Sequence, residues 1–257
     1  MSDYRKIVNL LEANTGAKRM SQVFEDFVEM AALAIRNAVD YRGRDEREEQ
    51  YRRTAGRYNR ASLDRFAQAL ALVTVEMERD PCDVLGRLYM ELELGNERLG
   101  QFYTPYDVAE LMAEMQIESV TEQVQTHGFA DLYEPTCGAG AFVVAVAQAM
   151  LEHGLNPQTQ LHVTAEDIAP QAIHMIYVHL TLLHIPAVVQ RRDTLTMRTF
   201  DSWFTPAHVL GGWGQKLRLV QANGRAQRLL STTLQDFAES RCTSSGTSTT
   251  RRSSAAG

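Results

Sequence analysis

The residues best suited to chemistry lie in and around one glycine-rich turn, Gly138-Ala139-Gly140. An apolar run at 130–133 precedes the turn and an alanine-rich segment follows it, so the sequence predicts a strand that turns sharply into a helix. Because glycine has no Cβ atom, the main chain here can approach a bound cofactor. Taken alone, the same turn also fits an ordinary connection between a strand and a helix.

Two carboxylates favour the cofactor interpretation, because they follow the next two candidate strands. An acid at the end of the second strand can accept hydrogen bonds from both hydroxyls of a ribose. Asp167 is the better candidate for that position, and its neighbour Glu166 is the rival. Asp193, at the end of the third strand, can accept a hydrogen bond from an adenine amino group. The turn and the two acids together predict a site for an adenosyl cofactor.

The elements that must position these residues alternate along the chain. Strands are expected at 130–133, 161–165 and 187–190, with a helix after each of the first two. This alternation predicts a parallel, doubly wound sheet in an α/β domain at 101–230. The aromatic residues at 203–213 are expected to lie in a loop.

Before this domain, residues 1–100 are predicted to form helices only, as a separate N-terminal domain. Ser21 and Ser62 are expected to cap two of these helices, and a further helix is expected at 83–94. Residues 231–257 form a low-complexity tail rich in Ser and Thr, which we expect to be disordered.

Helix starts and charge patterns are informative at three further places. Thr104-Pro105 is a capping signal for a helix that runs to about Ser119. The arginines at 42–60 alternate with acids, which favours a solvated helix with internal ion pairs over a phosphate-binding surface. His174, His179 and His184 are spaced five apart, which is not the spacing of two zinc ligands on one helix face, so no metal site is predicted.

Composition excludes several classes of protein. The 257 residues are 44% hydrophobic and 23% charged, which is ordinary for a soluble globular chain. The N-terminus has no signal-peptide pattern and no apolar run approaches the length of a membrane helix, so we expect a cytoplasmic protein. The net charge of -6 argues against binding to nucleic acid mainly through bulk charge. Three cysteines far apart fit neither a disulfide framework nor a zinc site.

Two motifs in order carry a family resemblance: Gln101-Phe102-Tyr103-Thr104-Pro105 and Glu134-Pro135-Thr136-Cys137-Gly138-Ala139-Gly140-Ala141-Phe142. They resemble the N-6 adenine DNA methylases, in particular the modification subunits of type I restriction systems. The resemblance implies a Rossmann-like sheet that binds S-adenosylmethionine, preceded by a helical region. It implies that Asp167 holds the ribose and Asp193 the adenine. It also implies that the following residues contact the cofactor: Phe102, Tyr103, Thr104, Pro105, Glu134, Pro135, Cys137, Gly138, Gly140 and Phe142.

The chain departs from that family in one motif and in length. The family places Asn or Asp, then Pro-Pro and an aromatic residue, after the third strand, and this sequence has no Pro-Pro pair. Asp201, Trp203 and Phe204 are the nearest substitutes: the acid can accept a hydrogen bond and an aromatic ring can stack on a base. Aromatic residues of a core or an interface are the favoured alternative. The chain is expected to be truncated, with a sheet that is short or completed by another subunit.

The resemblance implies a DNA methyltransferase that acts on the amino group of adenine, with DNA as its substrate. A specificity subunit, another restriction-modification subunit or a second copy is an expected partner. The alternative is a catalytically inactive, cofactor-binding partner or regulator of a restriction-modification or anti-restriction system. The missing Pro-Pro motif favours this second interpretation.

Overall fold

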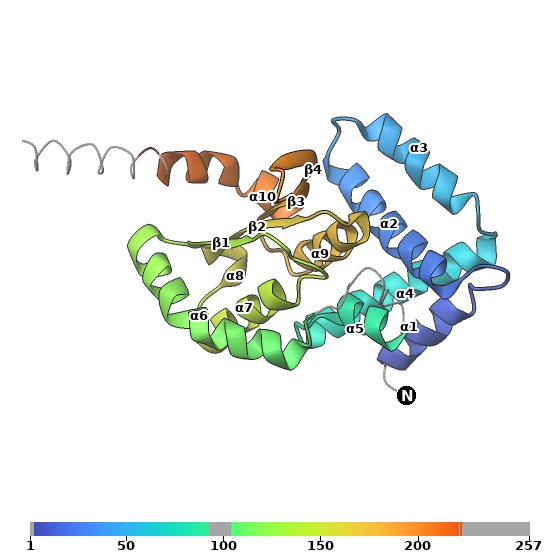
Figure 1. Ribbon diagram of the computed structural model, residues 1–257, viewed down its shortest axis with the longest axis horizontal. Helices are drawn as coiled ribbons and strands as arrows, with labels where there is room; N and C mark the ends of the chain where they lie inside the picture. Colours follow the sequence, from blue (N-terminus) through green and yellow to red (C-terminus); the bar gives the residue numbers. More distant parts are fainter. Residues whose placement is uncertain (1–2, 93–103, 221, 223–257) are drawn as a thin grey trace, which may run out of the picture. The chain divides into compact units, whose positions relative to one another are not determined.

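The computed structural model describes residues 3–92, 104–220 and 222 (Figure 1). Two compact units divide the chain, Met1–Trp213 and Gly214–Gly257, and the elements below all belong to the first. The predicted domain boundary near residue 100 and the predicted disordered tail lie outside the described residues, as do Phe102 and Tyr103. Within the described ranges, no helix is long and apolar enough to cross a membrane.

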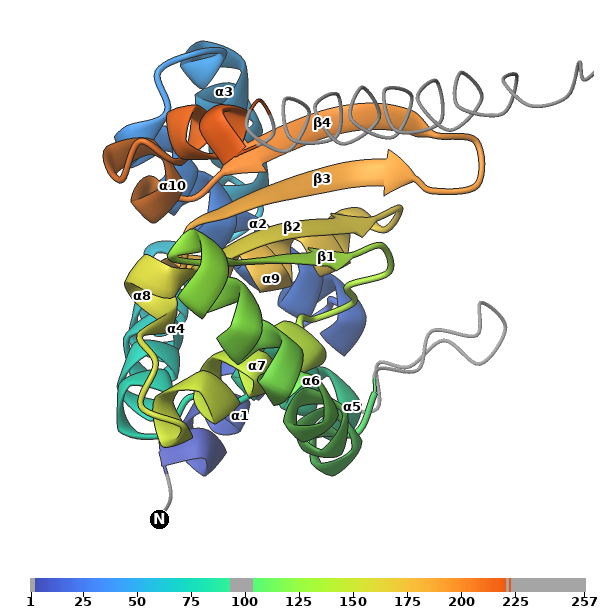
Figure 2. The ribbon, with the colours of Figure 1, turned by 90° about the vertical axis from the view of Figure 1, so that its left-hand side faces the viewer.

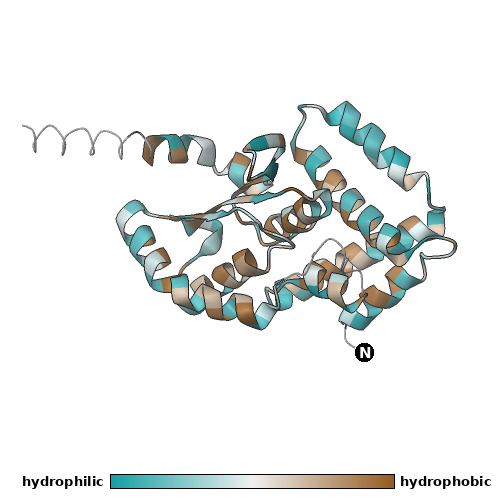
Figure 3. Ribbon diagram, viewed as in Figure 1, coloured by the Kyte–Doolittle hydropathy of each residue, from teal (hydrophilic) through white to brown (hydrophobic). Residues whose placement is uncertain are grey.

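The N-terminal region is helical, as the sequence predicts. Its helices are α1 (Asp3–Glu12), α2 (Met20–Val39), α3 (Arg44–Ala55), α4 (Arg60–Arg79) and α5 (Val84–Glu91). One apolar side of α2 is buried, and its Phe27 stacks on Phe66 of α4 with the ring centroids 5.7 Å apart. By contrast, α3 is hydrophilic along most of its length (Figure 3). Its ion pairs Arg52–Glu48 and Arg53–Glu49 are of the expected i,i+4 type.

Several helix boundaries differ from the sequence predictions. Arg19, without a side-chain cap, precedes α2, so Ser21 is not its cap. At α4, Asn59 is the cap and accepts a hydrogen bond from the backbone N–H of Ser62, which lies inside the helix. Asn and Ser both suit the cap position, and their spacing of three residues leaves the sequence unable to choose between them. Asp83 caps α5, which ends at Glu91.

The sheet contains four strands in the order β1-β2-β3-β4. The first three, β1 (Ala130–Glu134), β2 (Leu161–Asp167) and β3 (Ala187–Asp193), are parallel, as predicted. The fourth, β4 (Arg198–Phe204), runs antiparallel to β3. The sequence analysis assigned its last two residues, Trp203 and Phe204, to a loop. That prediction was wrong, because most of β4 is exposed and the strand therefore lacks an alternating apolar pattern.

Helices cover one face of the sheet. The connections from β1 to β2 and from β2 to β3 contain α7 (Ala141–Glu152) and α9 (Pro170–Leu182), with a short helix α8 (Pro157–Gln160) after α7. Because both connections step in the same direction along the sheet, both helices lie on one side of it (Figure 2). This differs from the doubly wound arrangement that the sequence predicts.

Two helices flank this core. The long helix α6 (Tyr106–His127) packs along α7, while α2 packs on α9 and so joins the helical region to the sheet. After β4, α10 (Pro206–Leu210) follows Thr205, whose side chain caps it. The core is continuous from α1 through α9 to β3, which gives the site below a rigid support.

Candidate cofactor-binding site

The glycine-rich turn lies between β1 and α7, as predicted. Both glycines have left-handed backbone conformations, with φ of 52° at Gly138 and 97° at Gly140. The turn is fixed to the neighbouring strand, because the N–H of Cys137 donates to the backbone oxygen of Glu166 over 2.9 Å. A Cβ atom at Gly140 would lie 2.8 Å from Cγ1 of Ile176 on α9. Glycine is therefore needed at position 140 for the close packing of two helices as well as for its φ.

Asp167 reaches the turn directly. Its Oδ2 accepts a hydrogen bond from the backbone N–H of Gly138 over 3.0 Å, and its Oδ1 accepts one from the N–H of Ala169 over 2.9 Å. The carboxylate is half-buried at the carboxyl end of β2. A carboxylate has about four acceptor positions, so each oxygen keeps capacity for a further donor. The structure thus brings together two of the predicted elements, the turn and this acid.

Glu166, the rival of Asp167, faces the other side of the sheet. It is only 1% exposed and accepts hydrogen bonds from the Tyr133 hydroxyl over 3.0 Å and from Arg192 over 2.8 Å. Successive residues of a strand point to opposite faces, so only one of the two acids can face the turn. The geometry favours Asp167.

Asp193 stands farther along the same edge of the sheet. Arg191 of β3 is paired with Asp167, which places Asp193 two residues beyond that level. Its carboxylate accepts hydrogen bonds from the N–H groups of Leu195 and Thr196 and so stabilises the turn before β4. Hydrogen bonds from Thr196, its side chain first, lower the pKa of Asp193. Its contacts with the described residues are thus made within its own turn, and its predicted role toward adenine stays a prediction.

The other residues of the first family motif lie by a different cavity. Thr104 and Pro105 are exposed and line a cavity of about 340 Å³ together with Asp83, Arg87 and Tyr106. Pro105 is the residue before α6, so the helix begins one residue later than predicted, and it continues to His127 rather than to Ser119.

In the second family motif, the side chains have different environments. Glu134 accepts hydrogen bonds from the N–H and the hydroxyl of Thr136 and so stabilises the start of the turn. Pro135 and Phe142 are half-buried, whereas Cys137 is buried. Burial, and then the nearby carboxylate of Asp167, raises the pKa of the Cys137 thiol, which keeps it neutral.

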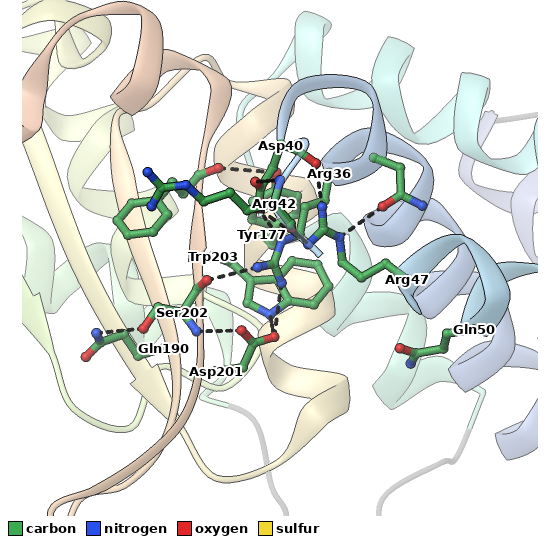
Figure 4. A network of polar contacts seen from close by, with 12 residues as sticks. Arg36, Asp40, Arg42, Arg47, Gln50, Tyr177, Gln190, Asp201, Ser202 and Trp203 are labelled. Carbon is green, nitrogen blue, oxygen red and sulfur yellow. Dashed lines mark hydrogen bonds and ion pairs between the residues drawn. The ribbon is translucent and has the colours of Figure 1, made fainter. Parts of the chain in front are cut away.

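Asp201 and Trp203, the substitutes for the missing catalytic motif, take part in a polar network with α2 (Figure 4). Arg36 donates to Asp201 over 3.0 Å and to the backbone oxygen of Ser202 over 3.1 Å. Its guanidinium also lies over the Trp203 ring, 4.3 Å from the centroid. Trp203 is 5% exposed and donates its indole N–H to Asp201 over 2.7 Å.

This arrangement favours the interpretation of Trp203 as a core residue, whereas Phe204 is 40% exposed. Trp203 packs edge-on against Tyr177 of α9, and at 5% exposure its indole ring is not open to a base. Phe204 lies opposite Val188 near the start of β3, at the end of the sheet away from Asp167. Neither residue approaches the glycine-rich turn.

A residue that the sequence analysis assigned no role, His179, contacts the turn. It is fully buried in α9, and its Nδ1 lies 2.9 Å from the backbone oxygen of Ala139. The backbone N–H of Leu85 donates to its Nε2 over 3.1 Å. Local sequence carries no signal for such a residue, because its partners come from two distant segments. Among the described residues, no group of three or more His, Cys, Asp or Glu side chains is placed to hold a metal ion.

Comparison with known proteins identifies the family. A family model described as N-6 DNA Methylase matches residues 83–224, more than half of the chain. The chain belongs to the N-6 DNA methylase family. The matched segment begins at Asp83, so it includes α5 of the helical region as well as the sheet.

Two solved structures resemble this N-6 DNA methylase family member. One is the type I restriction-modification system methyltransferase subunit from Streptococcus thermophilus, with 20% identity and a TM-score of 0.38, and the match covers 69% of this chain and 40% of that chain. The other is a putative class I S-adenosylmethionine-dependent methyltransferase from Listeria monocytogenes, with 12% identity and a TM-score of 0.37, and the match covers 73% and 52%. The chain thus spans about half or less of either relative. No curated protein matches its sequence.

Proposed function

We propose that this chain binds S-adenosylmethionine and transfers its methyl group to the exocyclic amino group of adenine in DNA. One observation carries the cofactor part of the proposal: the hydrogen bond of 3.0 Å between the Gly138 N–H and Asp167. It brings a left-handed glycine turn and a strand-end carboxylate to one point, in a member of the N-6 DNA methylase family.

The residues at this point suit an adenosyl group. Asp167 keeps acceptor capacity for ribose hydroxyls, while its two backbone donors hold the carboxylate in place. Asp193 is proposed to accept from the adenine amino group. When bound, the cofactor supplies a methyl group on a positively charged sulfur, which is the electrophile of the reaction. The turn at 138–140 is proposed to lie against the methionine part.

The remaining parts of the proposal concern the wider assembly. DNA is the proposed substrate, and the target base would be extruded from the duplex to reach the cofactor. A specificity subunit, another restriction-modification subunit or a second copy is the proposed partner. The cytoplasm is the proposed location.

Isothermal titration calorimetry with S-adenosylmethionine tests cofactor binding. The wild-type chain is expected to bind, and Asp167→Ala is expected to lose at least tenfold in affinity because the ribose acceptor is removed. Glu166→Gln is the matched control, since that side chain faces the other side of the sheet. Equal binding by Asp167→Ala and the wild type would overturn the proposed site.

Transfer of labelled methyl groups to unmethylated plasmid DNA tests the chemistry. A second function, a catalytically inactive cofactor-binding regulator, is favoured by the missing Pro-Pro motif and by the buried position of Trp203. Labelled DNA supports the enzyme. Cofactor binding without transfer, both alone and with candidate partner subunits, supports the regulator.

A further inference from the structure

The long helix α6 carries an apolar stripe on its solvent side. Its other side is buried and consists of small and branched residues, and α6 packs against α7 and β1. The buried residues are Ala109, Ala113, Ile117, Val120 and Val124. The stripe consists of Val108, Leu111, Met112 and Met115, which are 47%, 64%, 43% and 77% exposed. Spacings of three and four residues place these side chains on one face of the helix. Single exposed apolar side chains are common on protein surfaces, whereas a group of four on one face is typical of an interaction site.

Among the Asp, Glu, Lys and Arg residues of α6, the charge has one sign only. The helix has no Lys or Arg, and its acids are Asp107, Glu110, Glu114, Glu118 and Glu122. The four glutamates are spaced by four residues, so they form a ridge along the helix next to the stripe. A groove of about 650 Å³ follows this ridge and is lined by Glu114, Met115, Glu118, Glu122 and His153, among others. His153 lies 3.4 Å from Glu114. The other glutamates of the ridge have no Lys or Arg within α6 to pair with.

We infer that this face of α6, the stripe together with the acidic ridge, docks an amphipathic helix of a partner protein that carries Lys or Arg beside its own apolar residues. The stripe supplies area for helix-on-helix packing, and its two methionines adapt to the shape of a partner. The ridge selects a basic flank by charge complementarity. A second copy of this chain fits less well, because pairing of two α6 helices would bring five acids from each copy together without a basic residue from either helix.

A pair of synthetic peptides tests the inference by fluorescence anisotropy. Both are amphipathic helices with the same leucine stripe, one flanked by lysines and the other by glutamates. The lysine peptide is expected to bind at least tenfold more tightly than the glutamate peptide, and added salt is expected to weaken it. Leu111→Ser with Met115→Ser should reduce binding of the lysine peptide at least tenfold, since these variants keep every charge.

The control variant is Leu195→Ser, because that residue is 95% exposed but lies in the turn between β3 and β4. It should leave peptide binding unchanged. Equal binding of both peptides, or equal loss in the control, would overturn the inference. So would a concentration-dependent dimer of the wild type, seen by light scattering, that Met115→Ser abolishes, because a second copy would then occupy the face. S-adenosylmethionine titrations of the same variants keep this test separate from that of the cofactor site.

Discussion

The imidazole of His179 joins the glycine-rich turn to the helical region, because it lies 2.9 Å from the carbonyl oxygen of Ala139. A carbonyl only accepts, so Nδ1 carries the proton. On its other side, Nε2 accepts from the N–H of Leu85 at the start of α5, so that nitrogen carries none. The ring is therefore neutral, with one tautomer fixed by two backbone groups. Burial lowers the pKa of His179, which also favours this neutral form.

Replacement of His179 is expected to loosen both segments that it joins. In His179→Asn, the shorter side chain cannot reach both partners, so a buried donor or acceptor is left unpaired at a cost of about 1–3 kcal/mol. Urea denaturation measures that loss. Hydrogen exchange at the Leu85 amide should become faster in the variant, because this N–H loses its acceptor.

His184→Asn, in the turn that follows α9, is the control. His184 is exposed and has a φ of 55°, a conformation that Asn adopts readily, so the change should be neutral or slightly stabilising. If S-adenosylmethionine binds, His179→Asn should weaken its affinity and the control should not. Unchanged exchange at Leu85 would contradict the linking role.

Gly140→Ala tests why the turn needs glycine. The added Cβ would meet Ile176 at 2.8 Å, and a φ of 97° is strained for alanine. Gly128→Ala separates these two effects, since Gly128 has a φ of 82° with nothing within 4 Å of the added atom. We expect a loss of about 1 kcal/mol for Gly128→Ala and roughly 2–4 kcal/mol for Gly140→Ala, measured by urea denaturation. Equal losses would show that helix packing plays no part.

The parallel strands and the turn were predictable because their signals are local. Apolar runs mark β1, β2 and β3, and paired glycines mark the sharp turn. The strand β4 was not predictable in this way, since it is an exposed edge strand. Its position depends on Arg36, which lies more than 160 residues earlier in the chain. A contact of that kind leaves no periodic pattern in the sequence.

In the candidate site, too, local features were predictable from the sequence and contacts between distant segments were not. The strand-end position of Asp167 and the preference for it over Glu166 follow from the sequence. The fact that the two side chains lie on opposite faces of the sheet appears only in the folded strand. His179 was considered only as a metal ligand and rejected. One signal was available and unused: Thr205-Pro206 repeats the helix start seen in the sequence at Thr104-Pro105, and Thr205 does cap α10.

Arg36→Lys tests whether the network around Asp201 is structural. Lysine keeps the charge but cannot bond Asp201 and the Ser202 carbonyl together while it stacks on Trp203. We expect a loss of about 1–3 kcal/mol in the free energy of unfolding. Arg53→Lys is the control, because Arg53 is in an exposed ion pair with Glu49, and its loss should stay below about 0.5 kcal/mol.

The same network gives opposite expectations for Asp201→Asn under its two interpretations. If Asp201 is structural, the variant is less stable than the wild type, because the charge opposite Arg36 is lost. Its cofactor binding is then unchanged. If the variant keeps wild-type stability but loses transfer of labelled methyl groups to DNA, Asp201 acts on the substrate and the structural interpretation is wrong.

We expect the protein to lose stability in mild acid because of three buried histidines. Burial is the main cause that lowers the pKa of His174 to about 4, of His208 to about 4, and of His179 below its ordinary value of 6.5. For His208, the neighbouring His162 adds to this effect. The unfolded chain binds these protons at a higher pH than the folded chain does. The contribution of the neutral histidines to the free energy of unfolding is therefore complete above about pH 6.5. It falls as the pH drops toward 4, by up to about 1.4 kcal/mol per pH unit for each histidine.

Urea denaturation at several pH values between 7.5 and 4.5 measures this slope. His174→Phe removes one of the three groups while it keeps a ring beside Trp203, whose centroid lies 5.4 Å from that of His174. The slope of the free energy of unfolding against pH should therefore become shallower by about one proton in this variant. His153→Phe removes an exposed imidazole and is the comparison for the loss of a histidine side chain as such. A slope that does not change in His174→Phe would mean that this imidazole is not held neutral by burial.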